Sequence, residues 1–507
     1  MSLESTGVRD NAHRGAGATR DCILFLGLAL LFRVAYLLAT PRIIDSADAI
    51  HYIETAKHFV AGDFWQFNAK IPILYPLLAA LAHLFVADYE WAFALVSLVA
   101  STLLVIPAYA LSRDLHGPRA ARITALIVSI WPWLIDYASR IGPDALGCTL
   151  WFLSVWLFAR GLRRGSAWLL GALLAFIGLH LTRAEGTVLM AAAFAGAFVL
   201  CLGAENRSLR RLIPFGAGCA ILLGAYAAYM YFVTGAATVN YRVHFIVSEF
   251  SLARFAATGL RSFSDVLPVM LGPVLLVFMG VGLFHRERTV DAGPNDTFTC
   301  DARLEFYVLF FAAAQWFISL FVLSPEPRYL MSVTVALSLW SARGIAIVSD
   351  KLAGRSWGRI LRWAPVGLVI LLMLLGSAVS VGSQFLQRQP PQPLEYKVAG
   401  RWMKENLPPG LVFTRKPQVG YYADMPSTGP DLNDTLAQAI ERAKSVHARY
   451  IVVDERYTAK MAAGLAPLLD PALAPPDLRR LETFDLYPAS RVVIYEVLDQ
   501  AAASPPR

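Results

Sequence analysis

Between Cys22 and Thr40 the sequence reads CILFLGLALLFRVAYLLAT, a run of 19 residues with one charged member, Arg33. A helix needs about 20 predominantly apolar residues to cross the hydrocarbon core of a bilayer. A secretory signal peptide has a shorter apolar core and a small-residue cleavage site. The run therefore predicts a first transmembrane helix. The polar residues 1–21 before it are expected to form an N-terminal tail.

The composition of the whole chain is typical of a membrane protein. Of its 507 residues, 56% are hydrophobic and only 16% are charged, and the mean hydropathy is +0.50. Soluble domains carry about 25% charged residues. These values exclude a disordered protein, a coiled coil and an ordinary cytosolic enzyme. The net charge of +8 indicates orientation signals and contacts with membrane lipids, so we expect no nucleic acid as a partner.

Ten further apolar runs predict ten more membrane spans. They lie at 90–111, 119–136, 144–162, 166–182, 186–203, 212–233, 265–284, 304–323, 328–348 and 363–385. With the N-terminus inside, the inner segments carry about twice as many Lys and Arg as the outer ones, which is the bias that sets orientation. The pattern predicts a polytopic α-helical domain over residues 22–385, with long outer loops at 41–90 and 234–264.

Residues 386–507 are more polar and follow a different pattern. Short buried strands are predicted at Leu411–Thr414, Tyr450–Val453 and Arg491–Val497, and a helix is predicted at Asp434–Val446. An odd number of spans places this region outside the membrane. We expect a small C-terminal α/β domain that serves as a structural or acceptor-contacting cap, because no nucleophile elbow, phosphate loop or metal-ligand cluster is visible in its sequence.

The first outer loop carries a candidate catalytic group. Asp48, His51, Tyr52 and Thr55 share one face of a predicted helix, and the other face is apolar. Such an amphipathic helix is expected to lie in the membrane interface. Its carboxylate can act as a general base on an acceptor hydroxyl or amine. Equally, an Asp at a helix N-terminus is favoured by the helix dipole alone.

Charged residues also gather in three further outer turns. The turns hold Arg140 with Asp144, Arg183 with Glu185, and Arg328 with Tyr329. A single Arg at a membrane edge is usually an anchor. If the turns converge, they form an anion-binding site, because a guanidinium pairs with phosphate in a bidentate way.

These residues carry a resemblance to the GT-C superfamily of membrane glycosyltransferases. The most similar group is glycosyltransferase family 39, which includes protein O-mannosyltransferases, lipid A aminoarabinose transferases and galacturonic acid transferases. The similarity covers about residues 20–350 and follows the family's order. Its motifs are Asp48-x-x-x-Tyr52-x-x-x-Ala56, Lys70-x-Pro72, the Arg140/Asp144 turn, Thr182-Arg183-x-Glu185-Gly186 and Pro327-Arg328-Tyr329.

The resemblance implies a GT-C-like fold of about 11 transmembrane helices and a transfer reaction. A sugar would move with inversion from a polyprenyl-phosphate donor to an extracytoplasmic acceptor, which would be lipid A, a cell-envelope glycan, another lipid or a protein. Asp48 takes the family's catalytic-base position, and Asp45 is the alternative base. Asp144 is implied as a second site carboxylate.

The resemblance also implies that cations stabilise the leaving polyprenyl phosphate. The candidates are Lys70, Arg140 and Arg328. The rest of the site face is expected to hold His51, Tyr52, Arg183, Glu185 and Tyr329. Arg33 lies in the outer half of the first span, where it can either snorkel outward or contact a lipid phosphate.

Two positions depart from the family's pattern. Several relatives carry acids at the places of Ala49 and Ala69, and in some relatives such acids help to bind a divalent metal. Their replacement by alanine argues against a metal cofactor, for which His244 would remain a candidate ligand.

The abundance of Ala and the excess of Arg over Lys are typical of GC-rich bacteria. We therefore expect a bacterial inner membrane location, with a cytoplasmic N-terminus and a periplasmic C-terminal domain. Three alternatives stay open: a lipid-linked-sugar transporter or flippase, an O-antigen polymerase or ligase, and a non-catalytic scaffold or sensor. A transporter would need polar residues through the membrane depth, and a scaffold would tolerate loss of Asp48.

Overall fold

The computed structural model describes residues 4–66, 71–183, 185–201, 206–235, 251–285, 302–321, 326–354, 361–386, 393–431 and 433–498. The chain forms two compact units. The first combines Met1–Thr40 with Thr55–Ser377, and the second combines Pro41–Glu54 with Ala378–Arg507. The sequence-based division at residue 385 kept 41–54 with the membrane helices, whereas the structure groups this segment with the C-terminal region.

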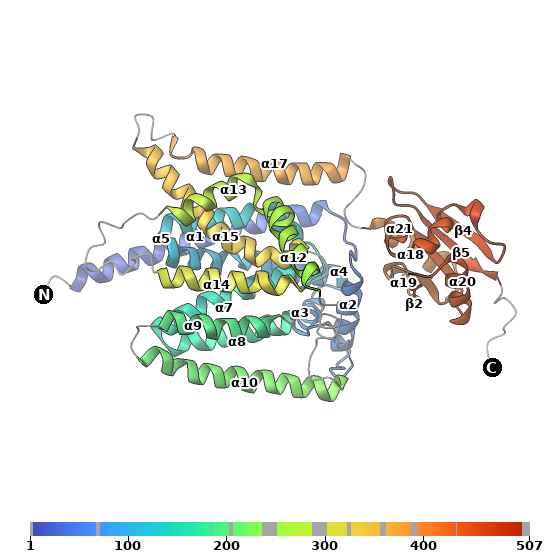
Figure 1. The fold of residues 1–507 in the computed structure, drawn as a ribbon, viewed down its shortest axis with the longest axis horizontal. Helices are drawn as coiled ribbons and strands as arrows, with labels where there is room; N and C mark the ends of the chain where they lie inside the picture. Colours follow the sequence, from blue (N-terminus) through green and yellow to red (C-terminus); the bar gives the residue numbers. More distant parts are fainter. Residues whose placement is uncertain are drawn as a thin grey trace. The chain divides into compact units, whose positions relative to one another are not determined.

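The first unit is built from helices that run side by side (Figure 1). They are α1 (Glu4–Ala39), α3 (Leu74–His83), α4 (Tyr89–Leu103), α5 (Val105–Ile130), α6 (Pro132–Tyr137), α7 (Asp144–Arg164), α8 (Ser166–Thr182), α9 (Gly186–Cys201), α10 (Asn206–Thr234), α12 (Leu252–Arg261), α13 (Leu267–Phe284), α14 (Ala302–Ser319), α15 (Pro327–Ala353) and α17 (Ala364–Leu386). A π-helical turn, Ser262–Val266, joins α12 to α13. The division between the units falls inside α17 and inside α2 (Ala47–Val60).

Within the described residues, six helical stretches are long and apolar enough to cross a membrane. They are Gly17–Ala39, Tyr89–Ile130, Asp144–Leu162, Arg210–Thr234, Leu252–Phe284 and Pro327–Ala353. Shorter apolar helices lie at Leu74–His83, Ala167–Thr182, Gly186–Gly196 and Ala364–Gly376. The count of eleven spans stays a prediction. The predicted loops are partly helical, since α3 lies within 41–90 and α12 within 234–264.

A glycine–proline pair breaks the longest of these stretches, Tyr89–Ile130. Gly117 has a φ of +83°, a backbone conformation that residues with a Cβ rarely adopt, and Pro118 follows it. The sequence predicts two spans here, at 90–111 and 119–136. The break lies between these two ranges.

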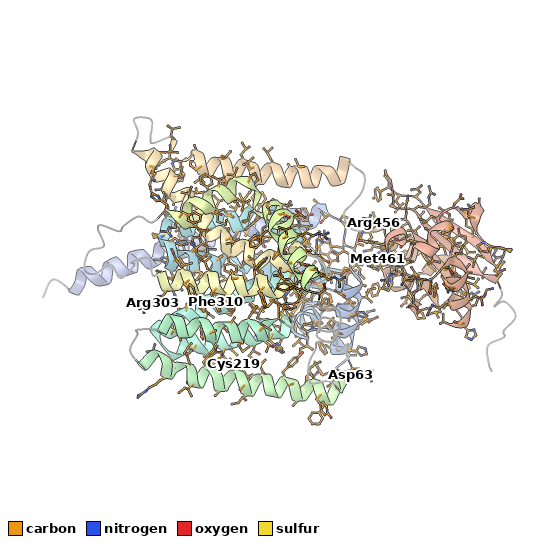
Figure 2. All side chains as sticks on the ribbon, in the orientation of Figure 1. Asp63, Cys219, Arg303, Phe310, Arg456 and Met461 are labelled. Atoms are coloured by element: carbon orange, nitrogen blue, oxygen red, sulfur yellow. The ribbon has the colours of Figure 1, made fainter. Side chains whose placement is uncertain are left out.

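Side chains occupy the space between the helices of the first unit (Figure 2), and many of the buried ones are aromatic. Trp151 and Phe158 of α7 pack on Phe311 of α14 and Phe176 of α8, with ring centroids 5.0 Å and 5.9 Å apart in the two pairs. Helices α5, α7 and α15 are mostly buried, whereas α1 and α10 expose most of their apolar residues. This distribution fits a bundle whose outer helices contact lipid.

Helices α13 and α15 cross at two glycines. A Cβ on Gly282 would overlap the backbone carbonyl of Trp340, and a Cβ on Gly344 would overlap the carbonyl of Phe278. The backbones can approach this closely only because neither residue has a side chain, as in small-residue contacts between membrane helices.

The second unit contains a five-stranded sheet in the order β2-β1-β3-β5-β4. The strands are β1 (Val412–Thr414), β2 (Ser427–Thr428), β3 (Tyr450–Asp454), β4 (Leu478–Phe484) and β5 (Val492–Val497). Strands β2, β1 and β3 are parallel, and β5 is antiparallel to both β3 and β4. The predicted strands correspond to β1, β3 and β5, and the sequence did not predict β2 or β4.

Helices cover both faces of this sheet. They are α18 (Leu394–Asn406), α19 (Gln418–Ala423), α20 (Leu436–Ser445) and α21 (Thr458–Met461), with 3₁₀ turns at Ala463–Leu469 and Pro471–Leu473. Strand β3 is buried throughout and alternates its side chains: Ile451 and Val453 face α20, and Tyr450 and Val452 face α18 and α19. Helix α20 begins two residues later than predicted, because Thr435 caps it in a capping box with Gln438.

We expect Gly282→Ala to destabilise the first unit by about 1–3 kcal/mol, because the added methyl group must push α13 away from α15. Gly280→Ala in the same helix is the matched control. A Cβ at Gly280 meets nothing within 4 Å, so helix propensity alone should act and stability should stay equal or rise slightly. Thermal unfolding of the purified protein in detergent compares the two variants. Equal melting temperatures would contradict the close crossing.

Candidate active site

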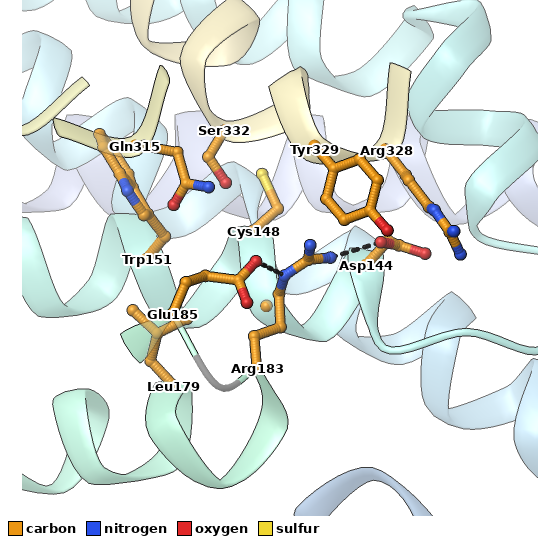
Figure 3. Close-up of a pocket in the computed structure, with 11 residues that line it drawn as sticks. Asp144, Cys148, Trp151, Leu179, Arg183, Glu185, Gln315, Arg328, Tyr329 and Ser332 are labelled. Carbon is orange, nitrogen blue, oxygen red and sulfur yellow. Dashed lines mark hydrogen bonds and ion pairs between the residues drawn. The ribbon is translucent and has the colours of Figure 1, made fainter. Parts of the chain in front are cut away.

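A small pocket lies in the first unit, between α7, α14, α15 and the turn that joins α8 to α9 (Figure 3). It brings together charged residues from turns that are far apart in the sequence. Its lining residues are Asp144, Gly147, Cys148, Trp151, Leu179, Arg183, Glu185, Gln315, Arg328, Tyr329 and Ser332. Five of the predicted site residues are therefore neighbours: Asp144, Arg183, Glu185, Arg328 and Tyr329.

The centre of the pocket is an ion-paired trio. Arg183 donates from Nη1 to Oδ1 of Asp144 at 2.5 Å and from Nε to Oε1 of Glu185 at 2.6 Å. The three side chains are only 13%, 9% and 18% exposed. Charge-assisted hydrogen bonds of this length are about twice as strong as neutral ones. The trio fixes both carboxylates with respect to one guanidinium.

Local backbone structure explains how each member of the trio is placed. Asp144 is the first residue of α7, where the helix dipole favours a carboxylate. Arg183 ends α8 in an extended conformation, and Gly186 then begins α9. A Cβ on Gly186 would lie 2.5 Å from the Cα of His180, so this short turn requires glycine.

The stem of Arg183 passes over a second glycine, on α7. A Cβ on Gly147 would lie 2.6 Å from the Cδ of Arg183. Gly147 therefore leaves the space through which the guanidinium reaches Asp144. Burial alone would lower the pKa of Arg183, but the carboxylates of Glu185 and Asp144 outweigh it and raise that pKa above its ordinary value. The guanidinium stays charged at physiological pH.

Arg328 and Tyr329 form the other wall, at the start of α15. The guanidinium carbon of Arg328 lies 4.9 Å from the centroid of the Tyr329 ring, and that of Arg183 lies 5.4 Å from the same centroid. Arg328 also pairs with Glu326 at 2.7 Å. Two cations on one aromatic ring favour a fixed ring position through cation–π attraction. The lining of the pocket thus holds two guanidinium groups, Arg183 and Arg328, and two carboxylates, Asp144 and Glu185.

Arg140 lies outside the residues that line the pocket. Its Nη2 pairs with Oδ2 of Asp136 at 2.7 Å, and its guanidinium covers the ring of Tyr137 at 4.9 Å. Asp136 also accepts a hydrogen bond from the hydroxyl of Tyr36 at 2.8 Å. A contact between Arg140 and a donor phosphate stays a prediction.

Arg33 does not snorkel outward, which was one of its two alternatives. Its side chain is fully buried, and it donates to Ser101 Oγ at 2.8 Å, to the carbonyl of Val128 at 3.0 Å, and to those of Ser129 and Ala29 at 2.9 Å and 3.2 Å. These bonds join α1 to α4 and α5. Its predicted contact with a lipid phosphate stays a prediction.

The sequence did not single out the apolar end of the pocket. Trp151, Cys148, Gln315 and Ser332 lie inside helices that read as membrane spans. Gln315 is 5% exposed, and a buried amide within an apolar run is the one available signal. Trp151 is fully buried, and its indole Nε1 has no hydrogen-bond partner. An unpaired buried donor is costly, so Trp151 marks a place for an acceptor atom of a ligand or a water.

Asp48, His51 and Tyr52 lie in the part of α2 that belongs to the second unit. Asp48 is in the first turn of α2, and the amide of Ala49 donates to Ser46 Oγ at 3.3 Å. His51 lies 3.4 Å from Glu54. Tyr52 and Thr55, which the sequence placed on the polar face of this helix, are buried. Asp45 lies in the segment that precedes α2.

Two of the predicted site residues, Lys70 and His244, lie outside the described residues. Within the part of the chain that the structure describes, no three His, Cys, Asp or Glu side chains are grouped to hold a metal ion.

Residues 70–232 match the family described as dolichyl-phosphate-mannose-protein mannosyltransferase. ArnT from Cupriavidus metallidurans in the apo state is similar in structure, with a TM-score of 0.59, 16% identity, and coverage of 96% of this chain and 100% of ArnT. The oligosaccharyltransferase of Archaeoglobus fulgidus has a TM-score of 0.61 at 15% identity, over 90% of this chain and 73% of that one.

The mycobacterial arabinofuranosyltransferase AftD has a TM-score of 0.53 at 14% identity, over 94% of this chain and 41% of AftD. A search of curated proteins gives no match. The chain thus resembles the family 39 glycosyltransferases and has the GT-C fold, as the sequence predicts. Its apolar helices and this fold identify a multi-pass membrane protein.

We expect Arg183→Met to destabilise the first unit by about 3 kcal/mol, because two partly buried carboxylates lose their counter-charge. Adding Asp144→Asn to this variant should restore part of the loss, since it removes one of the unpaired charges. Arg328→Met is the control, because its partner Glu326 is 46% exposed and such pairs contribute at most about 1 kcal/mol. Thermal unfolding in detergent measures all three. Equal losses for Arg183→Met and Arg328→Met would contradict the central place of Arg183.

Proposed function

We propose that this chain is a membrane glycosyltransferase of the bacterial inner membrane. It would transfer a sugar, with inversion, from a polyprenyl-phosphate donor to an acceptor on the outer face. The convergence of three separately predicted charged turns at one pocket carries this proposal. Membrane-edge anchors have no reason to converge, whereas a site that binds a phosphorylated sugar needs them together.

The residues of the pocket can divide the work of transfer. Arg183 is neutralised by two carboxylates, so we assign it to holding Asp144 and Glu185 in place. Arg328, on the Tyr329 ring, is our candidate for stabilising the charge of the departing phosphate. The Oδ2 atom of Asp144 is left to accept a hydrogen bond from a sugar or acceptor hydroxyl. The indole N–H of Trp151 can donate to an oxygen of the same ligand.

The base is proposed from the family pattern. Asp48 would take the proton from the acceptor as the acceptor oxygen or nitrogen attacks the anomeric carbon. The bond from that carbon to the phosphate oxygen breaks in the same step, and polyprenyl phosphate leaves. A single displacement inverts the anomeric configuration. Asp48 lies in the first turn of α2, a position that suits a side chain that must be held in one orientation.

Two relatives support a lipid phosphate as part of the donor. One structure of ArnT from Cupriavidus metallidurans contains bound undecaprenyl phosphate. One structure of AglB from Archaeoglobus fulgidus is a complex with an inhibitory peptide and a dolichol-phosphate. Both contain the leaving group that the proposed reaction would release. The acceptor of the present chain would be lipid A, an envelope glycan, another lipid or a protein.

We expect membranes that contain the wild-type protein to release polyprenyl phosphate from one of a panel of polyprenyl-phosphate sugars supplied with envelope acceptors. Asp48→Asn should lower this release at least about 100-fold, the lower end of the contribution of a general base. His58→Gln, a substitution of an exposed residue on the same helix that is not among the predicted site residues, is the control and should keep wild-type activity.

The outcome of this assay separates the alternatives. Equal release by a folded Asp48→Asn variant would remove Asp48 as the base and direct attention to Asp45. Movement of a lipid-linked sugar across the membrane without release would support a transporter instead.

We expect Trp151→Phe to weaken donor use about fivefold, because the ring is kept and only the N–H that meets the ligand is lost. Trp316→Phe is a matched control, since Trp316 also has a buried indole N–H without a partner but does not line the pocket. Steady-state kcat/KM with the identified donor compares them. Equal effects of the two substitutions would remove Trp151 from ligand recognition.

A further inference from the structure

The segment Pro41–Glu54 belongs to the same unit as the C-terminal region, more than 300 residues further along the chain. This segment carries Asp48 and leads directly into α2. Ile43 and Ile44 within it are 5% and 0% exposed, which is unusual for a stretch between two helices. The segment is therefore seated in the protein and does not extend into solvent.

Two hydrogen bonds fasten the backbone of this segment to the C-terminal helices. The amide of Ile44 donates to the hydroxyl of Tyr422 on α19 at 2.8 Å. The ammonium of Lys397 on α18 donates to the carbonyl of Arg42 at 2.7 Å. The same ammonium lies 5.4 Å from the centroid of the Tyr422 ring. The two side chains thus hold neighbouring backbone groups and also contact each other.

Close packing of α18 on α19 sets the position of these two side chains. A Cβ on Gly400 would lie 2.5 Å from the Cβ of Tyr422 and 2.6 Å from the carbonyl oxygen of Val419. Gly400 lies one turn after Lys397 on α18. The absence of a side chain at Gly400 therefore lets α18 and α19 approach, which brings Lys397 and Tyr422 to the segment from two helices.

The segment also approaches the residues that follow β3. Tyr457 follows β3, and its ring lies under the ammonium of Lys416, 3.7 Å from its centroid. Burial raises the pKa of Tyr457, and the nearby carboxylates of Asp454 and Asp45 add to the effect. Asp45, the alternative base in the sequence, thus lies near side chains of the C-terminal domain.

We infer that Tyr422 and Lys397 are positioning residues for the base, in that they hold Arg42–Ile44 and thereby fix the start of the helix that presents Asp48. The inference rests on the proposed role of Asp48. It gives the C-terminal domain a part in the reaction. The distance along the chain from Ile44 to Asp48 is four residues, so a shift at Ile44 passes directly to the first turn of α2.

Tyr422→Phe tests the inference, since it removes the hydroxyl and keeps the ring beside Lys397. Backbone hydrogen exchange over 41–54 should become about fivefold faster, the change expected from losing one hydrogen bond. With the donor that the wild-type protein uses, kcat should fall by a similar factor while KM for the donor stays constant. Lys397→Met should act in the same way, and Lys397→Arg, which can still donate to Arg42, should retain most of the activity.

Tyr450→Phe is the matched control. Tyr450 is also buried in the C-terminal domain, and its hydroxyl donates to the carbonyl of Pro408 at 2.8 Å, a bond of the same length that does not touch the segment. It should leave exchange over 41–54 and kcat unchanged. Equal effects of Tyr422→Phe and Tyr450→Phe would overturn the inference, because they would report general loosening of the domain.

Hydrogen exchange separates a failure of the inference from a failure of the proposed function. Unchanged exchange over 41–54 in Tyr422→Phe would overturn the inference whatever the enzyme does. Faster exchange with an unchanged kcat would overturn it too, since the held segment would then have no effect on the base. A wild-type protein that releases no polyprenyl phosphate would refute the proposed function, and the positioning of a base would fall with it.

Discussion

The pocket depends on one charged group, the guanidinium of Arg183, in a place where charge is poorly hydrated. Removing an ion from water costs several kcal/mol, and only well-oriented partners offset this cost. Asp144 and Glu185 supply those partners at 2.5 Å and 2.6 Å. Two glycines make the geometry accessible, one on α7 below the arginine stem and one at the start of α9. The ends of α7, α8 and α9 therefore meet around one paired cation.

Arg33 shows the same constraint with a different result. It is fully buried, and hydrogen bonds to a serine hydroxyl and three backbone carbonyls satisfy its guanidinium. A cation whose donors are used by the backbone joins helices. Arg328, by contrast, lies on an aromatic ring at a pocket and pairs with a carboxylate that is half exposed. The partners of an arginine distinguish its role better than its position along a span does.

The sequence predicted the features that arise from local pattern. Apolar runs gave most of the long helices and the two spans that flank Gly117–Pro118, and short buried runs gave β1, β3 and β5. The charged turns were recognised one by one, because each is a short polar stretch between apolar runs. Their convergence could not be derived, since it depends on how the helices pack. Trp151 gave no signal, because its unpaired N–H is a property of its surroundings.

The grouping of residues 41–54 with the C-terminal region is likewise invisible in the sequence. Hydrophobic periodicity identified α2 correctly, but burial of Tyr52 and Thr55 shows that its polar face is only partly exposed. The hydrogen bonds of Arg42 and Ile44 use backbone atoms, which every residue has. The residue types of the segment 41–54 therefore do not reveal these contacts. Their partners, Lys397 on α18 and Tyr422 on α19, look in the sequence like ordinary surface residues.

These contacts also bear on which carboxylate can act as a base. Asp144 is engaged by Arg183, so accepting a proton there would leave the guanidinium with one counter-charge fewer in a poorly hydrated place. Asp45 lies near Tyr457 of the C-terminal domain and precedes the helix, where it would be part of the support. Asp48 lies on the first turn of the helix that this support orients. A base has to be held in orientation and yet exchange its proton in every cycle, and among the three carboxylates the position of Asp48 suits both demands.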